Sequence, residues 1–309
     1  MTDVIEVTPL LTDLVSPGLA HIVPSEAGLE TVSTGFIATE GPLWNRREEY
    51  LLWSDMAGDR IYQWKPGSGT SVFIEPSGHS NGLTYDLQGR LLVAGFGSRS
   101  IWRIEPDGAK TVLAASYDGF KLQAPNDIVV KSDGSIYWTE STGAFTHPGL
   151  SGPGDEYDVQ QYRDLKPVLR LSADGSGLTS VVDDFEAPNG IAFSPDESLL
   201  YINDTRRRHI RVFDVKTDGT LGSGRIFYQD KQEERGNCDG MKVDVEGNVY
   251  VRASGGVHII DPAGQLLGRI RVPEMTNLAW GEADWRTLFI TGRQNIYRVQ
   301  LNIPGVPVW

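Results

Sequence analysis

Residues 189–213 read NGIAFSPDESLLYINDTRRRHIRVF, and this stretch contains three short apolar segments separated by polar turns. The segments begin at Asn189, Leu199 and Ile210 and are rich in β-branched and aromatic residues. Runs of this kind are typical of strands and are too short for helices. A similar segment follows at residues 225–228, after a turn at Asp218 and Gly219. The stretch therefore predicts a four-stranded antiparallel sheet.

The same design recurs six times along the chain. The units begin, at the start of the expected first strand, at Glu40, Asn81, Asn126, Asn189, Asp239 and Asn277. Their spacings are 41, 45, 63, 50 and 38 residues, close to the roughly 40–50 residues of a propeller blade except in the third unit. The sequence therefore predicts an all-β fold, a six-bladed β-propeller with four antiparallel strands per blade, forming one domain over residues 1–309. An open sandwich would leave the regular period unexplained.

Two segments fall outside this repeat. The sixth unit ends after its third strand, near Val299, while the segment LETVS at residues 29–33 belongs to no unit. We expect the N-terminal segment to complete the last blade, because a closed ring hides strand edges that would otherwise promote aggregation. Residues 1–27 are then an N-terminal extension. The long third unit carries a Gly/Pro-rich insertion at 141–165, expected to form a loop over the channel mouth.

The composition narrows the range of partners and compartments. The net charge of −13 disfavours nucleic acid and anionic membranes as partners, and no long apolar run is present. The N-terminus lacks the basic start and apolar core of a signal peptide. Cys238 is the only cysteine, so no internal disulfide can form. We therefore expect a cytoplasmic protein, whose oligomeric state the sequence leaves open.

Aligning the six units places their first residues at equivalent positions. Because the first strand of each blade lines the channel, these residues form a ring of two carboxylates and four amides. Such oxygen donors suit a hard divalent cation, above all calcium. Asn and Asp are also common turn residues, but Glu40 has no such preference and occupies the same position. The pattern favours one divalent cation on the axis.

Four motifs resemble those of the SMP-30/gluconolactonase/luciferin-regenerating family. They are TEGPLW at residues 39–44, APNDI at 124–128, APNGIAFSPD at 187–196 and CDGMKVD at 238–244. They occur in the family's order, and the resemblance covers roughly residues 35–300. It implies a six-bladed propeller that binds one divalent cation, usually calcium, with zinc or manganese as alternatives.

The resemblance also implies roles for individual residues. Glu40, Asn189 and Asp239 would bind the metal, and Asn126 would lie beside it, contacting the substrate or completing the metal's coordination. Asp239 would also be the general base, although the sequence does not decide whether it takes a proton or only positions water. Asn81 and Asn277 are not expected to bind.

The activity implied by the resemblance is hydrolysis of a small lactone. A cation can polarise the carbonyl, and a nearby carboxylate can activate water. An esterase or organophosphate hydrolase with the same metal site is an alternative, and so is a non-enzymatic binding scaffold, because fold does not imply function. The sequence does not identify the lactone or the metal.

Other motifs are weaker. Residues 78–82 (GHSNG) match the G-x-S-x-G pattern of serine esterases, but Ser80 enters a short strand and not the strand-to-helix turn that such a nucleophile needs. His79 is expected to contact the substrate beside the ring. Residues 206–208 (RRR) are expected to form an exposed blade turn.

Departures from the family predict the shape of the pocket. Many family members carry Cys-Glu-His-Gly where this chain has AGFG at residues 94–97. They also tend to have Arg-Leu-Asn-Ser where it has KLQA at 121–124, and Thr-Asp-Pro in place of TES at 139–141. We therefore expect Phe96, Gln123, Glu140 and the 141–165 loop to shape a pocket for a lactone other than plain glucono-δ-lactone. A less hydroxylated lactone is one such substrate, because an apolar wall discriminates only weakly against analogues that lack hydroxyls.

Overall fold

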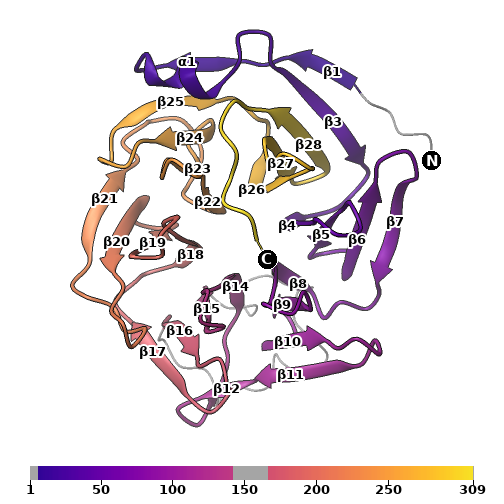
Figure 1. Ribbon diagram of the computed structural model, residues 1–309, viewed down its shortest axis with the longest axis vertical. Coiled ribbons are helices and arrows are strands. Elements are labelled where there is room, and N and C mark those ends of the chain that lie inside the picture. The colour runs from indigo at the N-terminus through magenta and orange to yellow at the C-terminus, as the bar shows by residue number, and fades with distance from the viewer. Residues whose placement is uncertain (1–5, 142–165, 309) are drawn as a thin grey trace.

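Six small antiparallel sheets form a ring around a central channel (Figure 1). The computed structural model describes residues 6–141 and 166–308. The six-bladed, all-β propeller expected from the repeat is confirmed. The loop predicted at 141–165 lies, apart from Ser141, outside the described residues.

The first three blades follow the chain in order, each numbered from the channel outwards. Blade one contains β4 (Thr39–Asn45), β5 (Tyr50–Asp55), β6 (Arg60–Lys65) and β7 (Gly69–Ile74). Blade two contains β8 (Ser80–Tyr85), β9 (Leu91–Gly95), β10 (Ser100–Ile104) and β11 (Lys110–Ala114). A small hairpin, β12 (Ser116–Tyr117) and β13 (Phe120–Lys121), precedes blade three. Blade three contains β14 (Pro125–Val130), β15 (Ile136–Glu140), β16 (Val168–Leu171) and β17 (Leu178–Val182).

The last three blades draw on both ends of the chain. Blade four contains β18 (Pro188–Phe193), β19 (Leu199–Asp204), β20 (His209–Asp214) and β21 (Arg225–Gln229). Blade five contains β22 (Met241–Val243), β23 (Val249–Ala253), β24 (Gly256–Ile260), β25 (Leu266–Ile270) and the N-terminal β2 (Thr12–Leu14). Blade six contains β26 (Met275–Gly281), β27 (Thr287–Gly292), β28 (Asn295–Gln300), β3 (Gly28–Thr34) and β1 (Glu6–Pro9).

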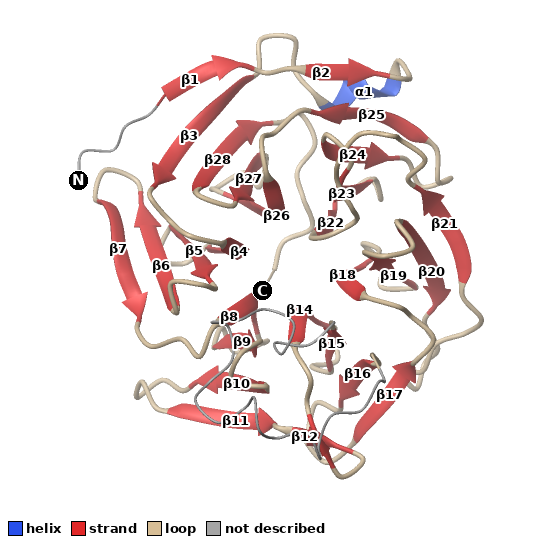
Figure 2. Ribbon diagram, turned by 180° about the vertical axis from the view of Figure 1, so that it is seen from behind, coloured by secondary structure: helices blue, strands red, loops and turns tan. Residues whose placement is uncertain are grey.

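The N-terminal segment closes the ring, as the sequence predicts. Strand β3 pairs antiparallel with β28, with Glu30 opposite Arg298 and Thr31 opposite Tyr297. The residues before β3 also join the blades. Strand β1 extends blade six and β2 extends blade five, with the short helix α1 (Gly18–Ile22) between β2 and β3 (Figure 2). The expected N-terminal extension therefore supplies a fifth strand to each of two blades. No helix in the described part of the chain is long and apolar enough to cross a membrane.

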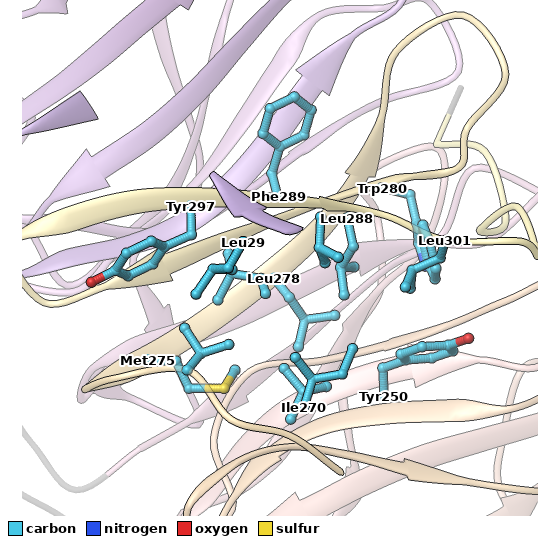
Figure 3. Close-up of a cluster of buried hydrophobic side chains, with 14 of the residues drawn as sticks. Leu29, Tyr250, Ile270, Met275, Leu278, Trp280, Leu288, Phe289, Tyr297 and Leu301 are labelled. Carbon is cyan, nitrogen blue, oxygen red and sulfur yellow. The ribbon is translucent and has the colours of Figure 1, made fainter. Parts of the chain in front are cut away.

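The core lies between neighbouring blades, because each sheet is covered by the next on both faces. Strands β5, β9, β15 and β27 are buried along their whole length. The largest cluster joins blades five, six and one, and includes Tyr250, Leu278 and Leu288 (Figure 3). At the seam between blades six and one, Trp44 stacks on Phe289 with ring centroids 5.5 Å apart.

β-Bulges interrupt the first strands at the position of the polar ring. The register between first and second strands shifts at this level in blades one, two, three, four and six. A bulge bends the strand locally and redirects its side chains. Glu40 and Asn189 are each followed by a glycine, because the neighbouring blade approaches closely at this level. A Cβ on Gly41 would lie 2.1 Å from the Asn81 carbonyl oxygen, and a Cβ on Gly190 would lie 2.3 Å from the Asp239 carbonyl oxygen.

The C-terminal tail occupies the end of the channel away from the ring. Gly305 pairs with Asp244, and the Val306 N–H donates to the Val243 carbonyl at 3.2 Å. These partners belong to the far end of the inner strand β22 and the turn after it. The tail, as far as Val308, consequently lies near the axis of the propeller (Figure 1).

Candidate functional site

The polar ring forms part of the lining of a large central cavity. This cavity has a volume of about 1050 Å³ and lies at the N-terminal ends of the inner strands. Five of the six aligned residues line it: Glu40, Asn81, Asn126, Asn189 and Asp239. The sixth, Asn277, supports the ring, because its amide nitrogen donates to Glu40 Oε2 at 3.2 Å. The structure thus brings together the four residues predicted as metal ligands.

Glu40 is the most deeply buried carboxylate of the cavity, at 9 % exposed. Besides Asn277, it accepts a hydrogen bond of 3.3 Å from the backbone N–H of Gly41. Burial, together with the negative charges of Asp239 and Asp127, raises the pKa of Glu40 well above its ordinary value. Two neighbouring buried carboxylates disfavour each other's charge, and a bound cation removes that conflict.

Asp239 is the second carboxylate of the ring, and its side chain is 20 % exposed. Burial raises the pKa of Asp239 to about 6, although the Arg252 guanidinium and the Asn189 amide lower it. Arg252 Nη1 lies 3.9 Å from Asp239 Oδ2, while the same nitrogen donates to the Asn237 carbonyl at 2.6 Å. Arg252 is therefore a partial counter-ion.

Asn189 has an acceptor atom with no partner among the described residues. Its Oδ1 is buried and makes no hydrogen bond, while its Nδ2 donates to Thr205 Oγ1 at 3.1 Å. Thr205 Oγ1 in turn donates to the Cys238 carbonyl at 2.9 Å, which fixes the orientation of the amide. A buried carbonyl-type oxygen without a donor is costly unless a ligand engages it.

The donor set fits a hard cation. The described residues contain no group of three His, Cys, Asp or Glu side chains suited to a metal, so any site here must combine the two carboxylates with amide oxygens. Such all-oxygen sets are typical of calcium, whereas zinc sites are built mainly from His and Cys. Asn81 Oδ1 also lacks a partner among the described residues, which adds an unexpected possible donor to the four predicted ones.

The residues predicted to contact the substrate fall into two groups. Phe96 lines the central cavity and packs with Met56 and Ala124. His79, Gln123 and Glu140 are not among the residues that line it; Gln123 and Glu140 line a separate cavity of about 30 Å³ instead.

Glu140 and His79 are held away from the central cavity by hydrogen bonds within the protein. The carboxylate of Glu140 accepts hydrogen bonds from Gln123 N at 2.6 Å, Ala124 N at 3.0 Å and Trp138 Nε1 at 2.7 Å. Nδ1 of His79 is bonded to the Met56 carbonyl at 2.7 Å. The predicted contacts of Gln123, Glu140 and His79 with the substrate thus have no support in the placement of these residues.

The G-x-S-x-G motif has no catalytic geometry. Ser80 lies in strand β8, is 0 % exposed, and shares a 2.8 Å hydrogen bond with Ser54. The neighbouring His79 is held by Met56 and not by Ser80. A serine nucleophile needs an exposed hydroxyl and a paired base.

Two features of the site were not predicted. One is Asp127, which stands directly after a ring residue where four other units have glycine. It is 2 % exposed, and its Oδ2 lies 3.4 Å from Lys242 Nζ. The other is a set of arginines that line the cavity: Arg206, Arg235, Arg252, Arg271 and Arg293. Aligning the units would have found Asp127, but all of the arginines except Arg252, which lies in β23, are on loops, where the repeat gives no register.

Two carboxylates and several amides at the floor of the central cavity define this chain as a six-bladed propeller with a polar channel site. The chain belongs to the SMP-30/gluconolactonase/LRE-like family, because residues 38–294 match the model of that region. It is 31% identical to a gluconolactonase from Zymomonas mobilis, over 94% of this chain and 86% of that protein.

Two further relatives extend this picture. The chain is 25% identical to a 6-deoxy-6-sulfogluconolactonase from Pseudomonas putida, over 86% of this chain and 92% of that protein. Among solved structures, it matches a gluconolactonase from Xanthomonas campestris with a TM-score of 0.85 and 32% identity, over 96% of this chain and 98% of that one. The family resemblance read from the four motifs is confirmed.

Proposed function

We propose that this protein hydrolyses a small sugar lactone, using one divalent cation held by Glu40, Asn189 and Asp239. The observation that carries the proposal is the buried Oδ1 of Asn189, which has no partner among the described residues, beside the buried Glu40 and the partly buried Asp239 at the floor of the cavity. Membership of the family and the names of its lactone-hydrolysing relatives support the reaction class.

The chemistry follows from the donor set. When bound, a divalent cation supplies polarisation of the lactone carbonyl and stabilisation of the negative charge that develops on its oxygen. Asp239 accepts a proton from water as the water oxygen bonds to the carbonyl carbon. The ring C–O bond then breaks, the ring oxygen takes up a proton, and the product is a hydroxy acid. Asn126 orients the substrate at the same floor.

The residues around this floor have supporting roles. Asn277 and the Gly41 N–H hold Glu40, and Thr205 holds the Asn189 amide, so the oxygens are positioned before any ligand arrives. Phe96 supplies an apolar wall. Calcium is the expected metal because every donor is oxygen, with zinc or manganese as alternatives. The cytoplasm is the expected location.

Metal removal tests this proposal. Protein dialysed against a chelator should lose hydrolysis of glucono-δ-lactone, and added Ca²⁺ should restore it. Elemental analysis of the purified protein identifies the resident metal. Full activity in verified metal-free protein would overturn the mechanism. Assays with a fluorophosphate ester separate the lactonase from an organophosphate hydrolase, and inactivity on both substrates would favour a binding scaffold.

A further inference from the structure

The walls of the central cavity differ in charge from the rest of the chain. The chain carries a net charge of −13, yet five arginines line this cavity: Arg206, Arg235, Arg252, Arg271 and Arg293. The carboxylates that line it within the described part of the chain are those of Glu40, Asp239 and Glu274. A basic wall in an acidic protein attracts anions to one place.

Two of the five arginines are engaged within the fold. Arg271 pairs with Asp13, with Nη2 2.8 Å from Oδ2, and also with Glu234 at 3.4 Å. Arg252 donates to backbone carbonyls and lies 3.9 Å from Asp239 Oδ2. These two side chains have partners that account for their charge.

The other three are different. Arg206, Arg235 and Arg293 are exposed, and none of their guanidinium groups makes an ion pair or hydrogen bond with any residue that the structure describes, although the backbone N–H of Arg206 donates to Asp204 Oδ1 at 2.9 Å. In contrast, Arg207, the neighbour of Arg206, lies 3.1 Å from Glu186. Three exposed guanidinium groups without partners at one cavity are not needed for the fold.

These three arginines lie on one side of the cavity. Arg206 is in the turn between β19 and β20 of blade four, Arg235 is in the loop that leads to blade five, and Arg293 is in the turn between β27 and β28 of blade six. Apolar side chains line the cavity from the other side, with Met56 and Phe96 from blades one and two. The cavity therefore has a polar floor, an apolar wall and a cationic wall.

We propose that the substrate is a lactone that carries an anionic group remote from its carbonyl. This inference rests on the proposed function, because the ring at the floor would hold the carbonyl. The cationic wall would bind a phosphate, sulfonate or carboxylate substituent, since guanidinium groups match the oxygens of such anions with paired hydrogen bonds. The carboxylate formed by hydrolysis arises at the floor, beside Arg252, and does not explain exposed arginines from three successive blades.

Substrate discrimination tests the proposal. We would measure kcat/KM for glucono-δ-lactone and for its 6-phosphate, 6-sulfonate and 6-carboxylate analogues, in the wild type and in Arg206→Gln, Arg235→Gln, Arg293→Gln and the triple variant. The wild type should prefer at least one anionic lactone by about 10-fold or more, and each substitution should lower that preference by roughly 3- to 10-fold. Which analogue is preferred identifies the anion.

Arg207→Gln is the matched control, because it removes the same charge one residue from Arg206 but does not line the cavity. It should leave the preference unchanged. Raising ionic strength should lower kcat/KM for the anionic lactone more than for the neutral one, because exposed charges are screened by salt. Equal kcat/KM for neutral and anionic lactones in the wild type, or equal losses for both in the triple variant, would overturn the proposal.

A binding measurement separates this inference from the proposed function. Calorimetric titration with 6-phosphogluconate and with inorganic phosphate reports the anion site without turnover. Binding that is lost in the triple variant and kept in Arg207→Gln supports the cationic wall even if no lactone is hydrolysed. Binding unchanged in the triple variant contradicts it, even if lactones are hydrolysed.

Discussion

The two ends of the central channel are built from the same strands and differ in almost every other respect. At the end where the inner strands begin, bulges present carboxylates and amides to a cavity of about 1050 Å³. At the end where they finish, a smaller cavity of about 390 Å³ is lined mainly by apolar side chains, such as Trp44, Phe193 and Trp280. The C-terminal tail, through Val306 and Val308, forms part of this lining.

The difference shows how one repeated strand pattern can form a polar cavity at one end of the channel and an apolar, closed end at the other. Where the strands of a pair are in regular register, alternate side chains pack between blades and the channel end fills with apolar groups. Where the register shifts, backbone and side chains turn towards the axis. Glycines then allow the next blade to approach, as at Gly41 and Gly190. In blades one, two, three, four and six the bulge, and not the strand itself, turns the ring residue towards the cavity, whereas Asp239 of blade five lies just before β22 begins.

The largest expected effect lies at the polar end. Asp239→Asn keeps the size of the side chain but removes a charge from the donor set and any basicity towards water, so kcat for lactone hydrolysis should fall about 1000-fold. Thermal unfolding should be little changed, because the substitution also relieves the repulsion between Asp239 and Glu40. Steady-state kinetics and a melting curve measure the two effects.

Ser80→Ala is the control for that variant. Ser80 is buried and bonded to Ser54, so its loss should lower stability by about 1 kcal/mol and leave kcat nearly unchanged. An inactive Ser80→Ala together with an active Asp239→Asn would replace the metal-site mechanism with a serine esterase.

The sealed end should respond in stability and not in catalysis. A Cβ on Gly305 would lie 1.8 Å from the ring of Trp280, so Gly305→Val should displace the tail and cost about 3 kcal/mol of unfolding free energy. Gly222→Val is its comparison, because a Cβ there meets Asp214 only at an ordinary 3.5 Å. Denaturant titrations measure the difference. A loss of kcat in folded Gly305→Val protein would mean that the two ends are coupled.

The boundary between the two ends is marked by Lys242 and Asp127. Lys242→Met removes the cation that faces the buried Asp127 carboxylate and leaves it the N–H groups of Ile128 and Ile191, so the metal-free protein should lose about 2 kcal/mol of stability. The extra negative charge beneath the ring should strengthen cation binding, so added Ca²⁺ should raise the melting temperature more in the variant than in the wild type. Lys231→Met, at an exposed position, is the control. Equal Ca²⁺-induced shifts in Lys242→Met and the wild type would contradict this coupling.

Glu140 offers a buried carboxylate outside the ring for comparison. Burial raises its pKa to about 7 despite three N–H donors. The folded state therefore holds the proton more tightly than the unfolded chain, and the resulting stability is fully present below about pH 4.5 and is lost as pH rises towards 7.

Urea unfolding of the wild type and Glu140→Gln measures this effect. Between pH 5 and pH 7 the wild type should lose about 2 kcal/mol relative to the variant, because glutamine does not titrate. The variant should be less stable at every pH, since one amide oxygen replaces two carboxylate oxygens. A difference that stays constant with pH would show that the three donors keep Glu140 ionised in the folded state.

The repeat predicted the blades, the closure by residues 29–33 and the ring, because these features depend on local alternation and on equivalent positions. It did not predict that residues 6–9 and 12–14 add strands to two blades, since an edge accepts any strand with free backbone groups. Gln123 and Glu140 were expected in the pocket because their motifs differ from the family, but their side chains lie in a separate cavity. The cationic wall is formed by loops, whose placement only the folded ring determines.

Closure of blade six by β3 has a consequence for how the protein is made. Residues 28–34 leave the ribosome long before their partner strand β28, which lies five blades further along the chain. Until then β3 can pair with β1 but not with β28, and the first-made blades lack the contact of Trp44 with Phe289. The joining of such distant segments is slow, because the whole intervening chain must already be ordered. Completion of the ring, and with it the enclosure of the cavity, therefore has to wait until β28 has been made.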